Sequence, residues 1–246
     1  MRLRRLSLLA LAAAILSPPC ATSAAPATAG AGPLGDGPSI SRMARLPAGG
    51  IQAVETTDGQ LLFITDNGRY LFRGTVHDLW NGVELTSLVQ AERLAGHLDL
   101  ARLKLDPADL GAINDGAGRE VVVFVDPDCE HCRALYADLP ALTDRYRFRL
   151  VALPIAAPSQ SVVLALHCLA STDPAAALKS LLAHDTQLPA PQGTCGQGTA
   201  QRTLVTAQIL GIRGTPFLIA PDGRLHQGRP DDLAAWLDGG AGEGTP

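Results

Sequence analysis

Residues 121–132 decide the fold, and they read Val-Val-Val-Phe-Val-Asp-Pro-Asp-Cys-Glu-His-Cys. Val121–Val125 is a continuous apolar run rich in β-branched side chains, which is typical of a strand that is buried on both faces of a sheet. Helix signals follow from Cys132 to Arg145. The two cysteines therefore lie between a predicted central strand and the start of a predicted helix.

This placement favours redox chemistry at the Cys-x-x-Cys pair. The start of a helix presents unpaired N–H groups and partial positive charge, which stabilise a thiolate at Cys129. A thiolate attacks disulfides, and Cys132 is close enough to resolve the mixed disulfide that results. A protonated His131 would favour the Cys129 thiolate further, whereas Glu130 opposes it. The sequence leaves the sign of this dipeptide's combined effect open.

A lone Cys-x-x-Cys also fits half of a zinc site or a structural disulfide. A structural zinc site takes four ligands in most proteins, and this chain has no second Cys-x-x-Cys. Cys168 and Cys195 are single and 27 positions apart. The remaining histidines show no ligand-like pairing: His77, His97, His167, His184 and His226. The position after a strand favours the redox interpretation, with no metal and no dissociable cofactor.

The first 25 residues have the pattern of a secretory signal peptide. Arg2, Arg4 and Arg5 precede an apolar run over 6–16, and small residues follow as far as Ala25. Eleven residues at ~1.5 Å each cannot cross a ~30 Å hydrocarbon core. We therefore expect cleavage and export to a bacterial periplasm, with Cys20 lost together with the signal.

Removal of residues 1–25 changes the formal charge from −4 to −7, because three arginines and no acid are lost. No basic block remains, which argues against nucleic-acid binding. The cysteines fall from five to four, and an even number suits two disulfides in an oxidising compartment. With 46% apolar residues, the chain can bury a substantial core.

Ahead of the predicted strand, the chain divides into three segments. Residues 26–39 form a flexible leader of small residues, glycine and proline. Residues 40–85 contain short apolar runs, with the pair Asn67-Gly68 predicting a two-residue hairpin turn between 61–65 and 69–73. Residues 86–117 form a helical linker, with helix from about 85 to 105 and a loop over 114–118.

The residues after the Cys-x-x-Cys helix predict an α/β domain over 118–240. A second strand covers 147–153, and helices cover 159–211 with an interruption at 188–198. A strand at 215–220, a turn, a return strand and a last helix over 231–237 complete it. Strands that alternate with helices in this way are typical of layered α/β folds.

Residues 121–132, with Gly-Ile-Arg-Gly-Thr-Pro at 211–216, resemble the thioredoxin fold of the DsbC/DsbG family of periplasmic thiol:disulfide interchange proteins. Residues 46–79 resemble that family's N-terminal dimerisation domain. The resemblance implies a thioredoxin-like catalytic domain with a helical insertion, preceded by a small α+β dimerisation domain and a helical linker. It also implies that the peptide between Thr215 and Pro216 is cis and faces the substrate.

The same resemblance implies a function and partners. It implies a homodimeric disulfide isomerase or reductase that acts on misfolded, misoxidised periplasmic proteins and receives electrons from a membrane thiol reductase of the DsbD type. Cys168 and Cys195 match the family's second, structural disulfide, the alternative being two free buried thiols. We expect the neighbouring His167 to lie on a helix surface.

Glu130-His131 departs from the Gly-Tyr dipeptide that is common in the isomerase. A histidine before the second cysteine resembles the oxidase DsbA, so the reduction potential stays open. The alternatives are a client-specific oxidase or reductase of a secretion or conjugation system, and a protein that handles copper or zinc through Cys129, His131 and Cys132. A third alternative is a chaperone without redox activity.

Overall fold

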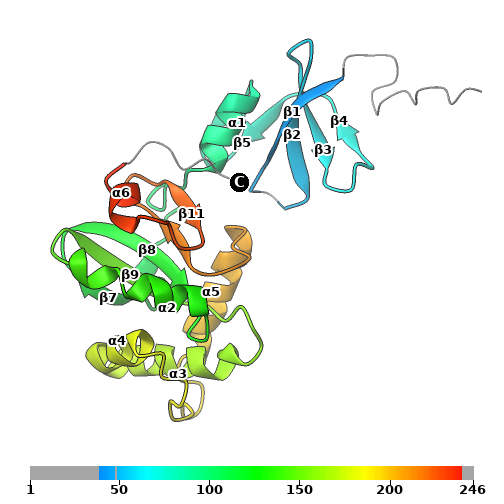
Figure 1. Cartoon of the computed structure of the whole chain (residues 1–246). Helices are drawn as coiled ribbons and strands as arrows, with labels where there is room; N and C mark the ends of the chain where they lie inside the picture. The colour runs from blue at the N-terminus through cyan, green and yellow to red at the C-terminus, as the bar shows by residue number, and fades with distance from the viewer. Residues whose placement is uncertain (1–38, 48, 240–246) are drawn as a thin grey trace, which may run out of the picture. The chain divides into compact units, whose positions relative to one another are not determined.

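The computed structural model describes residues 39–47 and 49–239 (Figure 1). The expected signal peptide, residues 1–25, lies outside the described residues, as does the leader except for Ser39.

The N-terminal elements form a small α+β unit. Four antiparallel strands lie in the order β1 (Ile40–Arg45), β2 (Ile51–Thr56), β3 (Leu61–Thr65) and β4 (Leu71–Phe72). A hairpin of β5 (Val76–Asp78) and β6 (Val83–Leu85) leads into helix α1 (Leu88–Ala95). One apolar cluster joins sheet, hairpin and helix through the buried side chains of Ala53, Phe63, Leu85, Leu88 and Ala91.

The prediction of a two-residue turn at Asn67-Gly68 is wrong. Only Gly68 has a positive φ, 68°, whereas the expected turn needs one at both positions. The Asn67 side chain instead accepts hydrogen bonds from the Thr65 hydroxyl and the Arg69 backbone. The loop therefore closes between Thr65 N–H and the Tyr70 carbonyl, and the return strand shortens to β4.

The predicted helix from 85 to 105 is also too long. Helix α1 ends at Ala95, and Gly96 caps it by donating to the Glu92 carbonyl. The Asp99 side chain then accepts from the Arg102 backbone and Lys104 has a φ of 55°, so short turns replace the helix. A 3-10 helix, η1 (Pro107–Leu110), follows.

The larger sheet has five strands in the order β11-β10-β8-β9-β7. The strand β8 (Arg119–Val125) lies at its centre and pairs in parallel with β9 (Tyr146–Ala152). Three strands run antiparallel to their neighbours: β7 (Ile113–Gly116), β10 (Phe217–Ile219) and β11 (Leu225–Gln227). The predicted central strand is confirmed.

The edge strand β7 lies where the sequence predicts linker and loop. Its sequence is rich in turn residues, but Gly116 and Gly118 lie directly against the backbone of residues 143–146. A Cβ at either glycine would collide with that backbone. The two glycines therefore permit close packing beside β9, where the sequence pattern suggested only a turn.

Helices cover both faces of this sheet (Figure 1). Val121, Val123 and Val125 pack into a core with α2 (Glu130–Tyr136), α3 (Ser159–Thr172), α4 (Pro174–Leu182) and α6 (Leu233–Leu237). Val122 and Phe124 point the other way, into a second core that includes Ala207 of α5 (Gln197–Ile209). The thioredoxin-like α/β fold with a helical insertion is therefore present.

The helix that starts at the Cys-x-x-Cys motif is shorter than predicted. We expected helix as far as Arg145, but α2 ends at Tyr136 and only a 3-10 turn, η2 (Leu139–Ala141), follows. Pro140 explains the break, because proline has no N–H to continue the helical hydrogen bonds.

Candidate active site

Cys129 lies at the junction between β8 and α2. Its N–H donates to the Asp126 carbonyl at 3.1 Å, which closes a turn after the strand. Cys129 then caps the helix, and its Sγ accepts from the N–H of Cys132 at 3.3 Å. A backbone donor and the start of a helix thus point at the Cys129 sulfur, and both stabilise negative charge there.

The two thiols have different environments. Cys129 is half-buried, whereas Cys132 is completely buried. Burial raises the pKa of the Cys132 thiol well above its ordinary range, and the hydrogen bond to Cys129 raises it further. Hydrogen bonds from the Asp126 backbone and the Thr215 side chain lower it in part. Cys132 is therefore a protonated thiol at neutral pH, and Cys129 is the sulfur that a substrate can reach.

Thr215 and Pro216 lie beside this dithiol, although Thr215 is 86 positions after Cys129 in the chain. The Cys129 thiol donates to the Thr215 carbonyl at 3.3 Å. The Thr215–Pro216 peptide bond is cis, and the Pro216 carbonyl accepts from Gly228 N–H at 2.8 Å. Thr215 thus contacts both sulfurs, through its carbonyl and its side chain.

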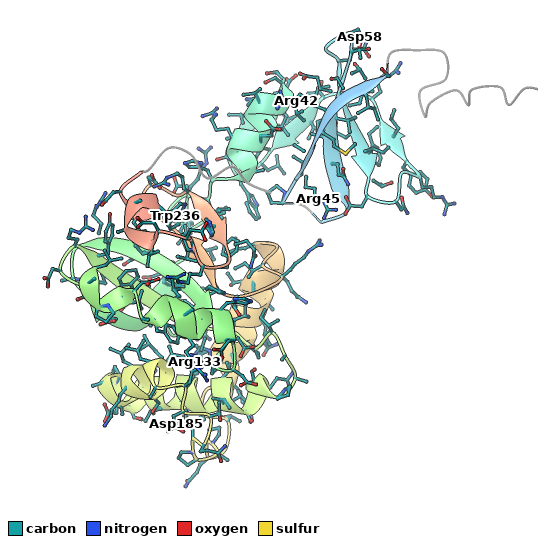
Figure 2. All side chains as sticks on the ribbon, in the orientation of Figure 1. Arg42, Arg45, Asp58, Arg133, Asp185 and Trp236 are labelled. Atoms are coloured by element: carbon teal, nitrogen blue, oxygen red, sulfur yellow. A yellow bond between two sulfur atoms is a disulfide. The ribbon has the colours of Figure 1, made fainter. Side chains whose placement is uncertain are left out.

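Glu130 and His131 are exposed on the first turn of α2. Glu130 forms an ion pair with Arg133, at 3.2 Å, one helical turn later (Arg133 is labelled in Figure 2). Exposed pairs of this kind contribute at most about 1 kcal/mol to stability. The pair nevertheless places a cation beside the carboxylate, which weakens the repulsion that Glu130 would exert on a thiolate.

Cys168 and Cys195 form a disulfide with a Cα–Cα distance of 5.2 Å. The bond joins α3 to the residues just before α5, and neither cysteine belongs to helix α2. Both cysteines are half-buried. The prediction that the adjacent His167 lies on a helix surface is wrong, because its ring is buried and contacts the Ala152 carbonyl at 3.1 Å.

The sequence interpretation missed three residues around the dithiol: Asp126, Tyr136 and His184. Asp126 is a buried carboxylate directly after β8. Burial raises the pKa of Tyr136 well above its ordinary range, and charges at Cys132, Cys129 and Asp126 add to this effect. The Asp-Pro-Asp stretch before Cys129 was the available signal for Asp126.

His184 follows α4, and no local pattern marks it as part of the site. Its ring lies 5.4 Å from the Tyr136 ring, centroid to centroid. Burial is the main cause that lowers the pKa of His184, and the charge of Arg133 adds to it. Residues 136 and 184 come together only in the folded chain, so the sequence alone does not predict their contact.

The described ranges, 39–47 and 49–239, contain no group of three or more histidine, cysteine, aspartate or glutamate side chains arranged to hold a metal ion. Within the same ranges, no helix has the length and apolar character needed to cross a lipid bilayer.

Comparisons with known proteins match both parts of the chain. The thioredoxin-like domain family matches residues 108–240, which is more than half of the chain. The disulfide bond isomerase protein N-terminal domain matches residues 23–87. The thiol:disulfide interchange protein DsbC of Haemophilus influenzae is 26% identical over 198 residues, covering 78% of this chain and 81% of that protein.

A second DsbC, from Dickeya dadantii, is 26% identical over 210 residues and covers 78% of each chain. Among solved structures, Proteus mirabilis ScsC in a compact conformation has a TM-score of 0.50 at 18% identity, covering 61% of this chain and 85% of that one. At this identity the structural likeness shows the fold alone.

The two family matches lie in the order that the sequence predicts, with the N-terminal domain ahead of the thioredoxin-like domain. The chain belongs to the thioredoxin-like family and is a DsbC/DsbG-like thiol:disulfide interchange protein, of the oxidoreductase/isomerase class.

Proposed function

We propose that Cys129 and Cys132 are the redox-active pair of a disulfide isomerase or reductase, with Cys129 as the attacking sulfur. One observation carries this proposal: Cys129 is half-buried and bound by a helix N–H, whereas its partner Cys132 is buried and held protonated. A substrate disulfide can approach only the first of these sulfurs.

The exchange then runs in balanced steps. The Cys129 thiolate attacks one sulfur of a substrate disulfide, so a mixed disulfide forms and the other substrate sulfur leaves as a thiolate. In isomerisation, the freed substrate thiolate attacks another substrate disulfide, which forms one new disulfide and releases a different substrate thiolate. That thiolate attacks the substrate sulfur of the mixed disulfide, which forms a second substrate disulfide and releases the Cys129 thiolate, with no net redox change. In reduction, Cys132 loses its proton, attacks Cys129 and frees the reduced substrate, which leaves the protein oxidised.

Thr215 and Pro216 form the substrate-facing loop in this proposal. The Thr215 carbonyl already contacts the Cys129 thiol, so a peptide bound along residue 215 would lie beside the attacking sulfur. Glu130 and His131 are the exposed dipeptide between the cysteines and tune the thiolate through their charges. Cys168 and Cys195 serve the structure.

The cellular setting is also part of the proposal. The signal-like residues 1–25 and the even cysteine count after their removal support export to the periplasm. Dimerisation through residues 40–85 would place two catalytic domains around one misfolded chain. An isomerase must be kept reduced, so we assign a membrane thiol reductase of the DsbD type as the electron donor and no dissociable cofactor.

Reactivation of scrambled ribonuclease tests this function. The reduced wild type should restore ribonuclease activity, Cys129→Ser should abolish the effect, and the double variant Cys168→Ala/Cys195→Ala should retain it if it is folded. Reactivation by Cys129→Ser equal to that of the wild type would contradict the proposal.

A client-specific oxidase or reductase is the second candidate, and His131 before the second cysteine favours it. Such a protein would oxidise or reduce its one client quickly and leave scrambled ribonuclease unchanged. The same assay with a reduced unfolded protein as substrate, and the oxidised enzyme in excess, separates net oxidation from isomerisation.

A further inference from the structure

Asp126 is a buried charge that the exchange steps above do not use. Its side chain is at the end of β8 and the residue is only 3% exposed. The described part of the chain has no ion pair to this carboxylate. A buried carboxylate without a cation is costly unless hydrogen bonds satisfy it, so its presence calls for a physical reason.

Backbone N–H groups from two different loops satisfy Asp126. One carboxylate oxygen accepts from the Asp128 N–H at 2.9 Å, within the loop that leads to Cys129. The other accepts from the N–H of Ile155 at 2.7 Å and of Ala156 at 3.3 Å, in the loop after β9. One side chain therefore ties the redox loop to the neighbouring loop. Hydrogen bonds to a charged acceptor are the stronger kind.

The backbone of the same residue contacts both members of the dithiol. The Asp126 carbonyl accepts from the Cys129 N–H, and a backbone hydrogen bond of Asp126 acts on the Cys132 thiol. A shift of the Asp126 backbone would therefore change a hydrogen bond to each of the two cysteines. The charge of Asp126, together with the two cysteines, also raises the pKa of the buried Tyr136.

We propose that Asp126 is a positioning residue of the thiol–disulfide exchange, which fixes the redox loop against the 155–156 loop and whose negative charge opposes the Cys129 thiolate. This inference rests on the proposed roles of Cys129 and Cys132. Like charges in a poorly solvated region repel strongly, so the carboxylate destabilises the reduced, thiolate form. The Cys129–Cys132 disulfide is therefore less oxidising than it would be at the start of a helix without this carboxylate.

The variant Asp126→Asn tests the charge. It keeps the side-chain size and one acceptor oxygen and removes the negative charge. Its NH2 group cannot accept, so the contact to one of the two loops is lost as well. We expect the equilibrium between the dithiol and glutathione to shift on the order of tenfold toward the reduced protein, which corresponds to about 30 mV for a two-electron couple. Asp128→Asn is the matched control, because this carboxylate is exposed in the same loop, and it should shift the equilibrium less than twofold.

The variant Asp126→Glu retains the charge and should return the equilibrium to within about threefold of the wild type. A purely structural role would instead perturb Asp126→Asn and Asp126→Glu alike, and equal shifts in both would overturn the inference. Equal potentials for Asp126→Asn and Asp128→Asn would also overturn it. A wild-type dithiol that does not equilibrate with glutathione would contradict the proposed function itself.

Hydrogen exchange in the wild type keeps the inference testable if the Asp126 variants do not fold. The amides of Ile155 and Ala156 should be protected, because Asp126 is their acceptor, whereas the amide of Ala157 in the same loop should exchange quickly. Equal exchange at 155, 156 and 157 would refute the positioning role.

Discussion

The carbonyl of Thr215 accepts a hydrogen bond from the Cys129 thiol at 3.3 Å, across 86 positions of the chain. The contact exists because β10 pairs with the central strand β8, which brings the segment before Phe217 to the end of β8 where the cysteines lie. One residue thus supplies a backbone acceptor to the half-buried sulfur of Cys129 and a side-chain hydrogen bond to the buried sulfur of Cys132.

Replacement of the buried cysteine should trap substrates. In Cys132→Ser, Cys129 still attacks a disulfide, but no thiol is present to resolve the product, so mixed disulfides should accumulate. Non-reducing electrophoresis and mass spectrometry would detect them as adducts at residue 129. The double variant Cys129→Ser/Cys132→Ser is the control and should carry none. Adducts that form at equal yield in the double variant would show that another cysteine attacks.

Removal of the Thr215 hydroxyl should slow the resolving step. Thr215→Val keeps the size of the side chain and the backbone carbonyl but loses the hydrogen bond that lowers the pKa of Cys132. A hydrogen bond to a charged group contributes about 1.5–3 kcal/mol, so the mixed disulfide should persist at least about tenfold longer. Stopped-flow decay of a mixed disulfide measures this lifetime. Thr172→Val, at an exposed hydroxyl, should leave it unchanged.

The sequence predicted much of the fold because its strongest patterns are local. The run Val121–Val125 indicated the central strand, and the position of Cys129 after it indicated the helix start. The errors arose where tertiary contacts override local signals. Gly116 reads as a turn residue, yet it permits β7 to lie against the backbone of β9.

The candidate site was predictable only where a motif is contiguous. The cysteines and Thr215-Pro216 were identified from their motifs and their resemblance to a family. Tyr136 is the last residue of α2 and His184 follows α4, and their proximity depends on packing that no spacing in the sequence reports. The sequence shows Asp126 three positions before Cys129. Its three N–H partners come from two loops, and the sequence alone does not connect those loops.

Loss of the disulfide between Cys168 and Cys195 should destabilise the catalytic domain without changing its chemistry. The chain-entropy model gives about 3 kcal/mol for a loop of this size, here with a sequence separation of 27. Urea unfolding of Cys168→Ala/Cys195→Ala should show this loss. Alkylation and mass spectrometry of the exported wild type should find both residues blocked, and two free thiols would contradict the pairing.

The homodimer should depend on the small N-terminal sheet. Its edge strands are β1 and β4, and they carry exposed Met43 and Phe72. Exposed edges and apolar side chains favour pairing with a second copy. Phe72→Asp should therefore shift the mass in light scattering at micromolar concentration toward the monomer. Val89→Asp, at an exposed apolar residue of α1, is the control and should remain dimeric; a monomeric wild type would contradict the dimer.

Buried His167 should make the protein less stable as the pH falls. Burial lowers the pKa of His167 to about 4, from an ordinary value of 6.5, so the folded protein keeps the ring neutral while the unfolded chain binds a proton. Above about pH 6.5 this histidine does not lower the free energy of unfolding. As the pH falls toward 4, the free energy of unfolding decreases by on the order of 3 kcal/mol. Urea unfolding at a series of pH values measures the slope. His167→Gln, which does not titrate, should flatten it, whereas the exposed His77→Gln should keep it. An unchanged slope in His167→Gln would show that another group carries the pH dependence.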